Sequence, residues 1–477
     1  MRHGIAGALF TILLCTILPD LTSAQDSKSP SASELQQTLK LAASYFRNQV
    51  AVHGGYVYYC SEDLTERWGE GKATDSMIVV QPPATPSVGE SYLRAYAVTG
   101  DSFFLDAARE AGEALVYGQL RSGGWTQVIH FKPPESGRMG AYRKSKGGGF
   151  NNSSLDDDQT QAALRFLAKL DKALDFQHAE IHEATLFGLN AMLEAQFACG
   201  AFPQVWTGPV EDQPILQANY PKYDWRTEGR IKEYWNNYTL NDGLAGTVAE
   251  TLIVAHQVYG DDKYQRALTS LGDFLIRAQM PNPQPAWCQQ YNHDMQPMWA
   301  RKFEPPAITG GESQDVMRTL IEIASYTGDL KYLEPIPAAV NYFEQNCMLP
   351  DGTLARYYEL QTNRPLYVDS KYQLTYDASD APSHYSWTVS ANFKRIKDNY
   401  GKLKSGQRLN TTKRRGVDSN RVREVVEQLD EQGRWVSRYE GQRLVGQPKF
   451  PVGFRYIASD VFNENIAVLC DFVESTD

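Results

Sequence analysis

A helical hairpin recurs along the chain, and this repeat constrains the fold more than any other feature of the sequence. In three copies, one helical run ends at a glycine-aspartate turn and a second helical run then leads to a glutamine. Glycine suits the left-handed residue after a helix, and aspartate caps the helix that follows. Residues 156 to 196 repeat the two helical runs without the clear turn. The turns are Gly100-Asp101, Gly260-Asp261 and Gly328-Asp329, and the glutamines are Gln119, Gln279 and Gln345.

Short loops with a glycine-aromatic or related element recur between the hairpins. The five elements HGGYVYY, SGGWTQ, CGAFPQ, QPAWCQQ and PDGTLARYY lie about 65 to 85 residues apart, the length of a helical hairpin with its connections. A single hairpin leaves an apolar stripe exposed to water, whereas successive hairpins around one axis bury these stripes. The sequence therefore predicts an all-α fold, an α/α toroid built as a barrel of helical hairpins, with short β-strands and long loops at one rim.

An acidic residue stands at or near each expected start of an inner helix. A single carboxylate at such a position is commonly a cap that interacts with free backbone N–H groups. In a toroid, however, the inner helices start at the same rim, and several carboxylates that converge there would bind a hard cation. The acids are Glu90 in PPATPSVGES, Asp156 to Asp158 in SSLDDDQTQ, Asp242 in YTLNDGLAG and Glu312 in PPAITGGESQD.

The first residues have the pattern of a secretory signal peptide, with a basic start, an apolar stretch and a small-residue exit that ends at Ala24. No later stretch is apolar over the eighteen or so residues that a membrane helix needs. We therefore expect a secreted or periplasmic protein without membrane insertion after signal removal. The predicted organisation is a signal peptide over 1–24, a flexible leader over 25–32, an α/α-barrel domain over 33–400 and a C-terminal helical extension over 401–477 that packs on the barrel.

Charge and composition exclude several classes of function. The formal net charge of -10 argues against a nucleic-acid binder, because phosphate contacts need a basic surface. A basic block between Lys394 and Arg423 is either a solvated helix and loop or a binding strip for an anionic polymer. The sequence lacks the HExxH motif of zinc enzymes. The cysteines outside the signal peptide form either one or two disulfides or buried free thiols.

Six motifs occur in order between roughly residues 150 and 400: SLDDDQTQAALRFLAK, GAFPQ, YTLNDG, AWCQQYNHDMQPMWARKFEPPAITGGES, LARYYELQTNRPLYVD and KYQLTYD. Together they resemble the family 10 pectate lyases, calcium-dependent enzymes with an α/α barrel and a cleft for polygalacturonate. The resemblance implies the same barrel, Ca²⁺ as cofactor and an acidic polysaccharide similar to polygalacturonate as partner.

The resemblance also implies roles for four residues at the starts of two helices. Asp156 and Asp242 would serve the calcium ion or the substrate carboxylate, and Asp242 is in addition a catalytic candidate. Asp157 and Asn241 stand beside these acids and are expected to contact substrate. Calcium prefers oxygen ligands, so aspartates supply the chemistry that such a site needs.

The same resemblance directs attention to three arginines. Arg301 and Arg356 are implied to hold substrate carboxylates or to flank the reacting sugar, with Arg356 as a catalytic candidate. A guanidinium group matches a carboxylate with two parallel hydrogen bonds, which suits this role. Arg364 precedes a proline in TNRP and either braces its loop or binds substrate.

The sequence departs from the family where the catalytic base is expected. The family loop that carries an arginine after the position of Asp369 is shortened here to Ser370-Lys371-Tyr372. Lys371 is the proposed substitute base, because lysine lowers its pKa when it is desolvated or crowded by other cations. The alternatives are that Lys371 is an exposed loop residue, that another group acts, or that the reaction is altered or lost.

We therefore expect a secreted, monomeric polysaccharide lyase that cleaves pectate or polygalacturonate by calcium-assisted β-elimination. One alternative is a glycoside hydrolase on the same toroid, which would use two of the helix-start acids. Another is a catalytically silent polyuronate-binding protein. An epimerase is disfavoured by the sparse histidines. Trp125, Trp206 and Trp287 follow the repeat loops and either stack on sugars or pack in the core.

Overall fold

The computed structural model describes residues 30–134, 137–145, 148–409 and 418–476. The predicted signal peptide and most of the predicted leader lie outside these residues. The described residues form twelve α-helices and only small sheets, so the predicted all-α class is confirmed. The helices are α1 (Ala32–Tyr45), α2 (Thr85–Thr99), α3 (Ser102–Gly118), α4 (Gln159–Ala173), α5 (Ala179–Glu194), α6 (Leu244–Tyr259), α7 (Asp262–Arg277), α8 (Gly310–Thr327), α9 (Ile336–Asn346), α10 (Phe393–Lys404), α11 (Ser419–Gln428) and α12 (Ser459–Thr476).

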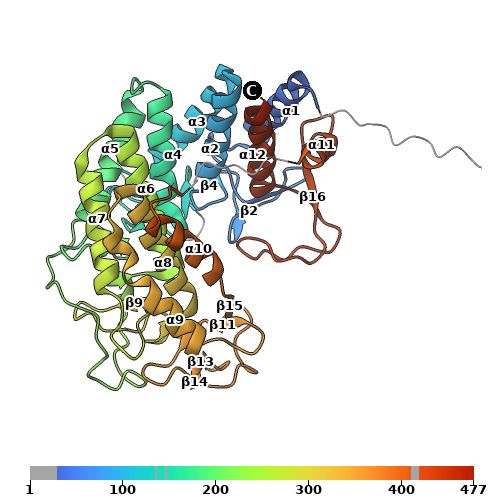
Figure 1. Cartoon of the computed structure of the whole chain (residues 1–477). Helices are drawn as coiled ribbons and strands as arrows, with labels where there is room; N and C mark the ends of the chain where they lie inside the picture. Colours follow the sequence, from blue (N-terminus) through green and yellow to red (C-terminus); the bar gives the residue numbers. More distant parts are fainter. Residues whose placement is uncertain (1–29, 135–136, 146–147, 410–417, 477) are drawn as a thin grey trace, which may run out of the picture.

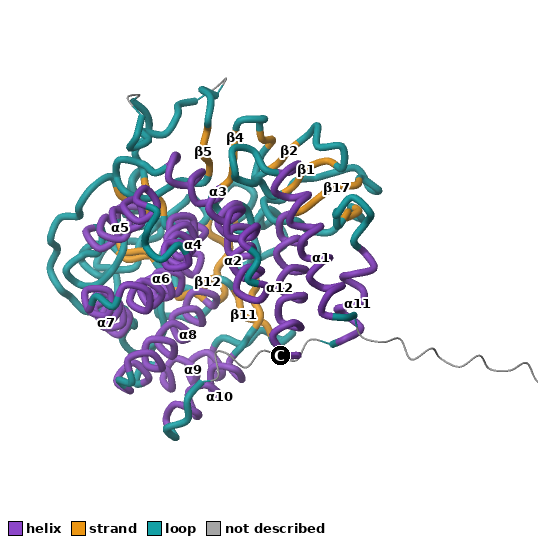
Figure 2. Tube along the Cα trace, turned by 90° about the horizontal axis from the view of Figure 1, so that it is seen from above, coloured by secondary structure: helices purple, strands orange, loops and turns teal. Residues whose placement is uncertain are grey.

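The helices form the inner and outer layers of a toroid (Figures 1 and 2). Helices α12, α2, α4, α6, α8 and α10 contact one another in this order and make up the inner row. Helices α3, α5 and α7 each follow one inner helix in the chain and pack against it. Most residues of α4 are buried, as expected for a helix that other elements cover on several sides. The predicted α/α toroid of helical hairpins is confirmed.

The recurring glutamines hold neighbouring hairpins together. Nε2 of Gln119 donates to a carbonyl of its own loop and to the carbonyl of Ala184 in the next outer helix, at 2.8 Å each. Gln196 and Gln279 make the same two kinds of bond, each at 2.9 to 3.0 Å. Gln345 departs from the pattern, because it is exposed and bonds within its own helix. Three of the four glutamines are therefore structural links of the repeat.

A short antiparallel strand pair precedes each of four inner helices. In each pair, one strand leads into the inner helix and the other follows the loop after the outer helix. This pairing fixes the starts of the inner helices at one rim of the toroid. The pairs are β4 (Met77–Val79) with β5 (Val128–His130), β6 (Ser153–Ser154) with β7 (Val205–Trp206), β8 (Tyr238–Thr239) with β9 (Gln290–Tyr291), and β10 (Ile308–Thr309) with β12 (Tyr357–Tyr358).

Strand β12 extends into a further hairpin at the same rim. The four-stranded sheet has the order β10-β12-β13-β14, with β13 at Pro365–Val368 and β14 at Leu374–Thr375. Nearby in the chain, β11 (Thr353–Ala355) pairs with β15 (Thr388–Ser390). Residues of the motifs LARYYELQTNRPLYVD and KYQLTYD lie in these strands and their connections.

The two ends of the described chain meet in one sheet. Its strand order is β16-β17-β1-β2-β3, and Tyr59 of β1 pairs with Ala458 of β17. Helix α12 packs on α1 and α2 (Figure 1). The boundary expected at residue 400 falls inside α10, which packs on α8. The strands are β1 (Tyr59–Ser61), β2 (Arg67–Trp68), β3 (Lys72–Ala73), β16 (Val436–Arg438) and β17 (Arg455–Ala458).

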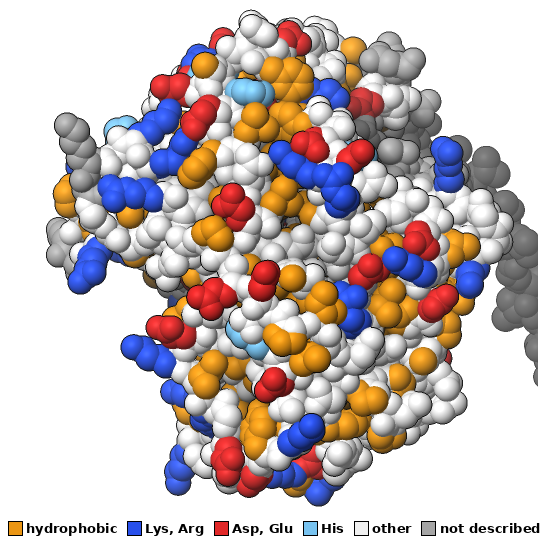
Figure 3. Space-filling model, turned by 90° about the vertical axis from the view of Figure 1, so that its left-hand side faces the viewer, with side chains coloured by type: hydrophobic (Ala, Val, Ile, Leu, Met, Phe, Trp, Pro, Cys, Tyr) orange, Lys and Arg blue, Asp and Glu red, His pale blue; other side chains and the backbone are white. Residues whose placement is uncertain are grey.

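The core settles two alternatives that the sequence leaves open. Trp125, Trp206 and Trp287 are buried, and each indole N–H donates to a backbone carbonyl, so these tryptophans pack in the core. Cys60, Cys199, Cys288 and Cys347 are buried free thiols, and Cys470 is also buried. No helix in the described part of the chain is long and apolar enough to cross a membrane. On the face shown in Figure 3, acidic and basic side chains are interspersed.

Candidate active site

Two inner helices begin with the same unusual turn. The 3-10 turns Asp156–Asp158 and Asn241–Gly243 lead directly into α4 and α6. In the first turn, φ is 44° at Asp157 and 63° at Asp158, and in the second it is 50° at Asp242. These left-handed values are uncommon for residues other than glycine, and such strain gathers at functional sites. The two turns also contact each other, so they bring side chains from separate hairpins together.

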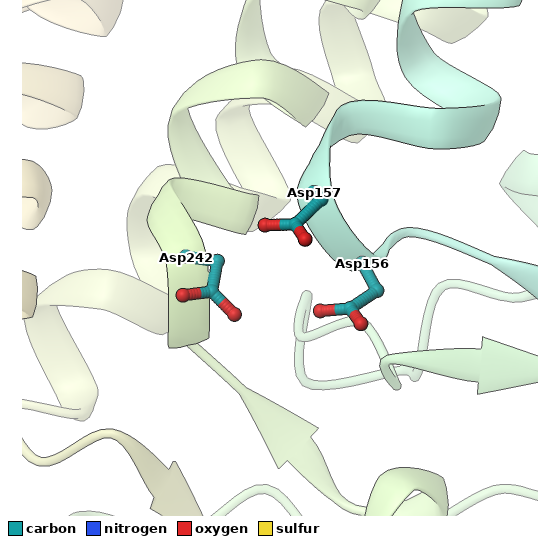
Figure 4. Close-up of side chains that lie close together, drawn as sticks. All are labelled: Asp156, Asp157 and Asp242. Carbon is teal, nitrogen blue, oxygen red and sulfur yellow. The ribbon is translucent and has the colours of Figure 1, made fainter. Parts of the chain in front are cut away.

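Three carboxylates meet where these turns touch (Figure 4). Carboxylate oxygens of Asp156, Asp157 and Asp242 all lie within 4.8 Å of one another. Asn241 donates from Nδ2 to Asp242 Oδ2 at 2.5 Å, while its own Oδ1 is buried without a hydrogen-bond partner. The atoms that could bind a cation here are oxygens, and the three carboxylates are close enough for one cation to contact them all. Oxygen atoms are the ligands that Ca²⁺ prefers. The residues present therefore fit the cofactor that the resemblance implies.

The pKa shifts of the aspartates also favour a bound cation. Desolvation where the turns meet, together with the charges of Asp156 and Asp157, raises the pKa of Asp242 to about 8. Desolvation, Asp156 and Glu70 raise the pKa of Asp157 to about 6, although both residues remain partly exposed to solvent. Carboxylates this close cannot all ionise at low cost unless a positive charge joins them. The nearby Arg301 supplies part of that charge, because it acts to lower the pKa of both Asp157 and Asp242.

Arg301 is held firmly by a buried carboxylate. Its Nε and Nη2 donate to the two oxygens of Glu304 at 2.8 and 2.6 Å. Burial alone would raise the pKa of Glu304, but these bonds from Arg301 hold that pKa below its usual range. Glu304 therefore stays ionised and fixes the guanidinium group beside the aspartates.

Arg356 reaches the same site through α8. Its Nη2 lies 3.4 Å from Oε1 of Glu312, which belongs to the first turn of α8. Burial raises the pKa of Glu312, and the charge of Glu312 in turn raises the pKa of Asp242. The structure thus gathers the predicted Asp156, Asp242, Arg301 and Arg356 at one rim.

Two other helix-start acids do not join the cluster. Asp158 forms a bidentate ion pair with the buried Arg165. Glu90 lies 2.8 Å from Lys169 and is in the second turn of α2. The first pair lies within the start of α4, and the second joins α2 to α4, so we assign these acids a structural role.

The predicted Arg364 and Lys371 lie in the β13-β14 region. Arg364 places its guanidinium carbon 3.4 Å from the ring centroid of Tyr376. Lys371 is exposed on the turn between the strands, where its backbone N–H donates to Asp369. Within the described chain, no hydrogen bond or ion pair joins either side chain to the three aspartates. Their roles stay predictions.

Sequence reasoning missed two glutamines that orient the carboxylates. Gln204 donates from Nε2 to Asp156 Oδ1 at 2.7 Å. Gln81 donates from Nε2 to Asp157 Oδ2 at 3.2 Å and to Glu70 Oε1 at 3.3 Å. Gln204 stands in the GAFPQ motif, which could have identified it. Gln81 follows β4, and no local signal in the sequence marks it.

Fold and site together define an α/α toroid with an acidic, arginine-lined site at the starts of its inner helices. Residues 121–353 match the model of the family described as pectic acid lyase. The family resemblance predicted from the motifs is therefore confirmed, and the class of enzyme that it supports is a polysaccharide lyase. Among curated proteins, none matches this chain.

Solved structures with a similar fold come from several kinds of enzyme. A mutant of the family 10 polysaccharide lyase from Cellvibrio cellulosa, in complex with trigalacturonic acid, is 20% identical with a TM-score of 0.46; the match covers 66% of this chain and 98% of that one. A cellobiose 2-epimerase from Bacillus thermoamylovorans is 13% identical with a TM-score of 0.45, covering 93% and 98%. A GH76 alpha-mannanase from Bacteroides thetaiotaomicron is 9% identical with a TM-score of 0.43, covering 93% and 96%.

Proposed function

We propose that this protein is an exported polysaccharide lyase that cleaves pectate or polygalacturonate by calcium-assisted β-elimination. The observation that carries the proposal is the cluster of Asp156, Asp157 and Asp242 beside Arg301, within the segment that matches the pectic acid lyase family. The trigalacturonic acid bound to the similar Cellvibrio enzyme suggests the chemistry of the substrate. We propose further that the protein acts as a monomer.

The reaction sets demands that this arrangement can meet. In β-elimination a base removes the proton at C5 of a galacturonate unit, the bond from C4 to the glycosidic oxygen breaks, and a C4–C5 double bond forms. The proton at C5 is hard to remove while the adjacent carboxylate is ionised, so positive charge must stabilise the enolate-like transition state. Calcium held by the three aspartates would supply part of that charge.

The remaining charge comes from the arginines. Burial acts to lower the pKa of both guanidinium groups. The hydrogen bond and charge of Glu304 act against it at Arg301, and the charge of Glu312 acts against it at Arg356. The pKa of each group therefore stays above its usual value. Both groups are therefore permanent cations that can bind carboxylates in bidentate fashion. In our proposal they hold the uronate carboxylates, and Arg356 flanks the reacting sugar.

Lys371 is the proposed base, and its position makes the alternatives testable. Its exposed place on the β13-β14 turn also suits a chain that binds polyuronate without cleaving it. Replacement by methionine keeps the length of the side chain and removes the amine. If Lys371 is the base, Lys371→Met abolishes product formation and leaves substrate affinity close to that of the wild type.

One assay separates the three functions. The purified protein is incubated with polygalacturonate in the presence of calcium or a chelator, and the ultraviolet absorbance of the unsaturated product is followed. Calcium-dependent absorbance supports the lyase. New reducing ends without absorbance support a hydrolase, and binding without either product supports a silent binding protein.

A further inference from the structure

Tyr385 lies against both arginines of the proposed substrate site. The guanidinium carbon of Arg356 is 4.2 Å from the centroid of the Tyr385 ring, and that of Arg301 is 5.9 Å away. Both distances are within the roughly 6 Å over which a guanidinium group is attracted to an aromatic ring. Phe303 and Trp387 pack against the same ring with centroid distances of 4.9 and 5.4 Å.

The hydroxyl end of Tyr385 is also fixed. It donates to Oε1 of Glu304 at 3.1 Å, the same oxygen that accepts from Nη2 of Arg301 at 2.6 Å. Burial and the charge of Glu304 raise the pKa of Tyr385, so the hydroxyl keeps its proton and remains a donor. The hydroxyl of the fully buried Tyr357 lies 3.0 Å away and donates to Gln289 at 2.8 Å. The ring is therefore anchored at both ends.

Arg356 depends on this ring more than Arg301 does. Arg301 has two short hydrogen bonds to Glu304, whereas Arg356 has a longer 3.4 Å contact with Glu312. Nε of Arg356 and Oε2 of Glu312 are buried without hydrogen-bond partners among the described residues. A buried guanidinium with an unpaired N–H is prepared to receive an anionic ligand. The aromatic face keeps that group from turning away.

We propose that Tyr385 is a positioning residue that aligns the guanidinium groups of Arg301 and Arg356 for the carboxylates of an anionic sugar chain. This inference rests on the proposed function. Tyr385 lies outside the segment 121–353 that matches the family. It acts through the arginines and has no assigned contact with the reacting atoms.

Two substitutions separate the ring from the hydroxyl. Tyr385→Phe keeps the ring over the arginines, and Glu304 keeps its bonds from Arg301, so kcat and KM on polygalacturonate should stay within about threefold of the wild type. Tyr385→Leu removes the ring and should lower kcat/KM by about tenfold or more, since a desolvated cation–π contact is of that order. The affinity for trigalacturonate, measured by calorimetry, should fall in the leucine variant alone.

Tyr367→Leu is the matched control. Tyr367 is buried and packs on the same Trp387, with a centroid distance of 6.2 Å, but the described contacts do not join it to either arginine. It should lower the melting temperature as Tyr385→Leu does and leave kcat/KM unchanged. Equal losses of activity in both leucine variants, or full activity in Tyr385→Leu, overturn the positioning role. A wild-type protein that neither binds nor cleaves polygalacturonate overturns the proposed function and this inference together.

Discussion

Asp157 and Asp242 begin two different inner helices from left-handed backbone positions, and their carboxylate oxygens lie within 4.8 Å of each other. Neither residue caps its helix, because the N-caps of α4 and α6 are Asp158 and Gly243. The two strained backbone positions have one shared result, which is the convergence of negative charge at one point. Such a convergence is costly unless protons or a cation join it.

Calcium should stabilise the wild-type protein and should do so through Asp242. In the presence of a hundredfold excess of calcium over its dissociation constant, mass action adds about 2.7 kcal/mol to the free energy of unfolding. Asp242→Asn should lose this increment, because the amide cannot supply a charged ligand. Thermal unfolding with calcium and with a chelator measures the effect. The exposed Asp262 at the start of α7 offers a control, since Asp262→Asn should respond to calcium like the wild type.

Without calcium, the free energy of unfolding should fall as the pH rises from about 5 to about 8. The pKa of Asp157 is raised to about 6 and that of Asp242 to about 8, whereas an unfolded aspartate titrates near 4. The folded state therefore binds more protons than the unfolded state in this window, and stability declines with pH until both groups have ionised.

The Asp242→Asn variant also tests this pH dependence. Asp242→Asn does not titrate at that position, so its stability in chelator should decline less between pH 6 and 8 than that of the wild type. At pH 8 the calcium-free variant should be more stable than the calcium-free wild type. Parallel pH profiles for the two proteins would show that the three carboxylates do not repel one another as the geometry requires.

The repeat and the helix-start acids were predictable because their signals are local. A glycine with positive φ ends each first helix at Gly100, Gly260 and Gly328, and an aspartate caps the next element. The hydrophobic spacing of the helices then requires a shared core, and the toroid follows. The convergence of Asp156 with Asp242 follows from the toroid itself.

Other parts of the site had no local signal. Glu70 stands between two-residue strands near the N-terminus, and Tyr385 stands in a long connection after β14. Their contacts with Asp157 and the arginines depend on how distant segments pack, which neither periodicity nor capping encodes. The strands that position the inner helices are only two or three residues long, too short for alternation to reveal them. Whether Lys371 is the base likewise depends on the bound substrate and stays a prediction.

Gln81 should influence the cation site without being a ligand. Its amide group donates to Asp157 and Glu70 together, and its oxygen accepts from Gln127 at 3.3 Å. Loss of such an outer partner typically costs about tenfold or more in metal affinity. Gln81→Leu should therefore weaken calcium binding by about tenfold in a calorimetric titration. The exposed Gln345→Leu is the control, and an affinity equal to that of the wild type in Gln81→Leu would assign Gln81 to structure alone.

Gln279 should stabilise the fold and leave the chemistry unaffected. Gln279→Leu deprives the Pro285 carbonyl of its donor, whereas the Pro335 carbonyl keeps the backbone N–H of Ala339; an unpaired buried acceptor costs about 1–3 kcal/mol. We expect the free energy of unfolding to fall by about 1 kcal/mol or more in a denaturant titration. Gln345→Leu should change it by less than about 0.5 kcal/mol, because that side chain is exposed and bonds only within its own helix. Calcium affinity of the folded Gln279→Leu protein should match the wild type. Equal stability of the two variants would show that the glutamine links do not hold the hairpins together.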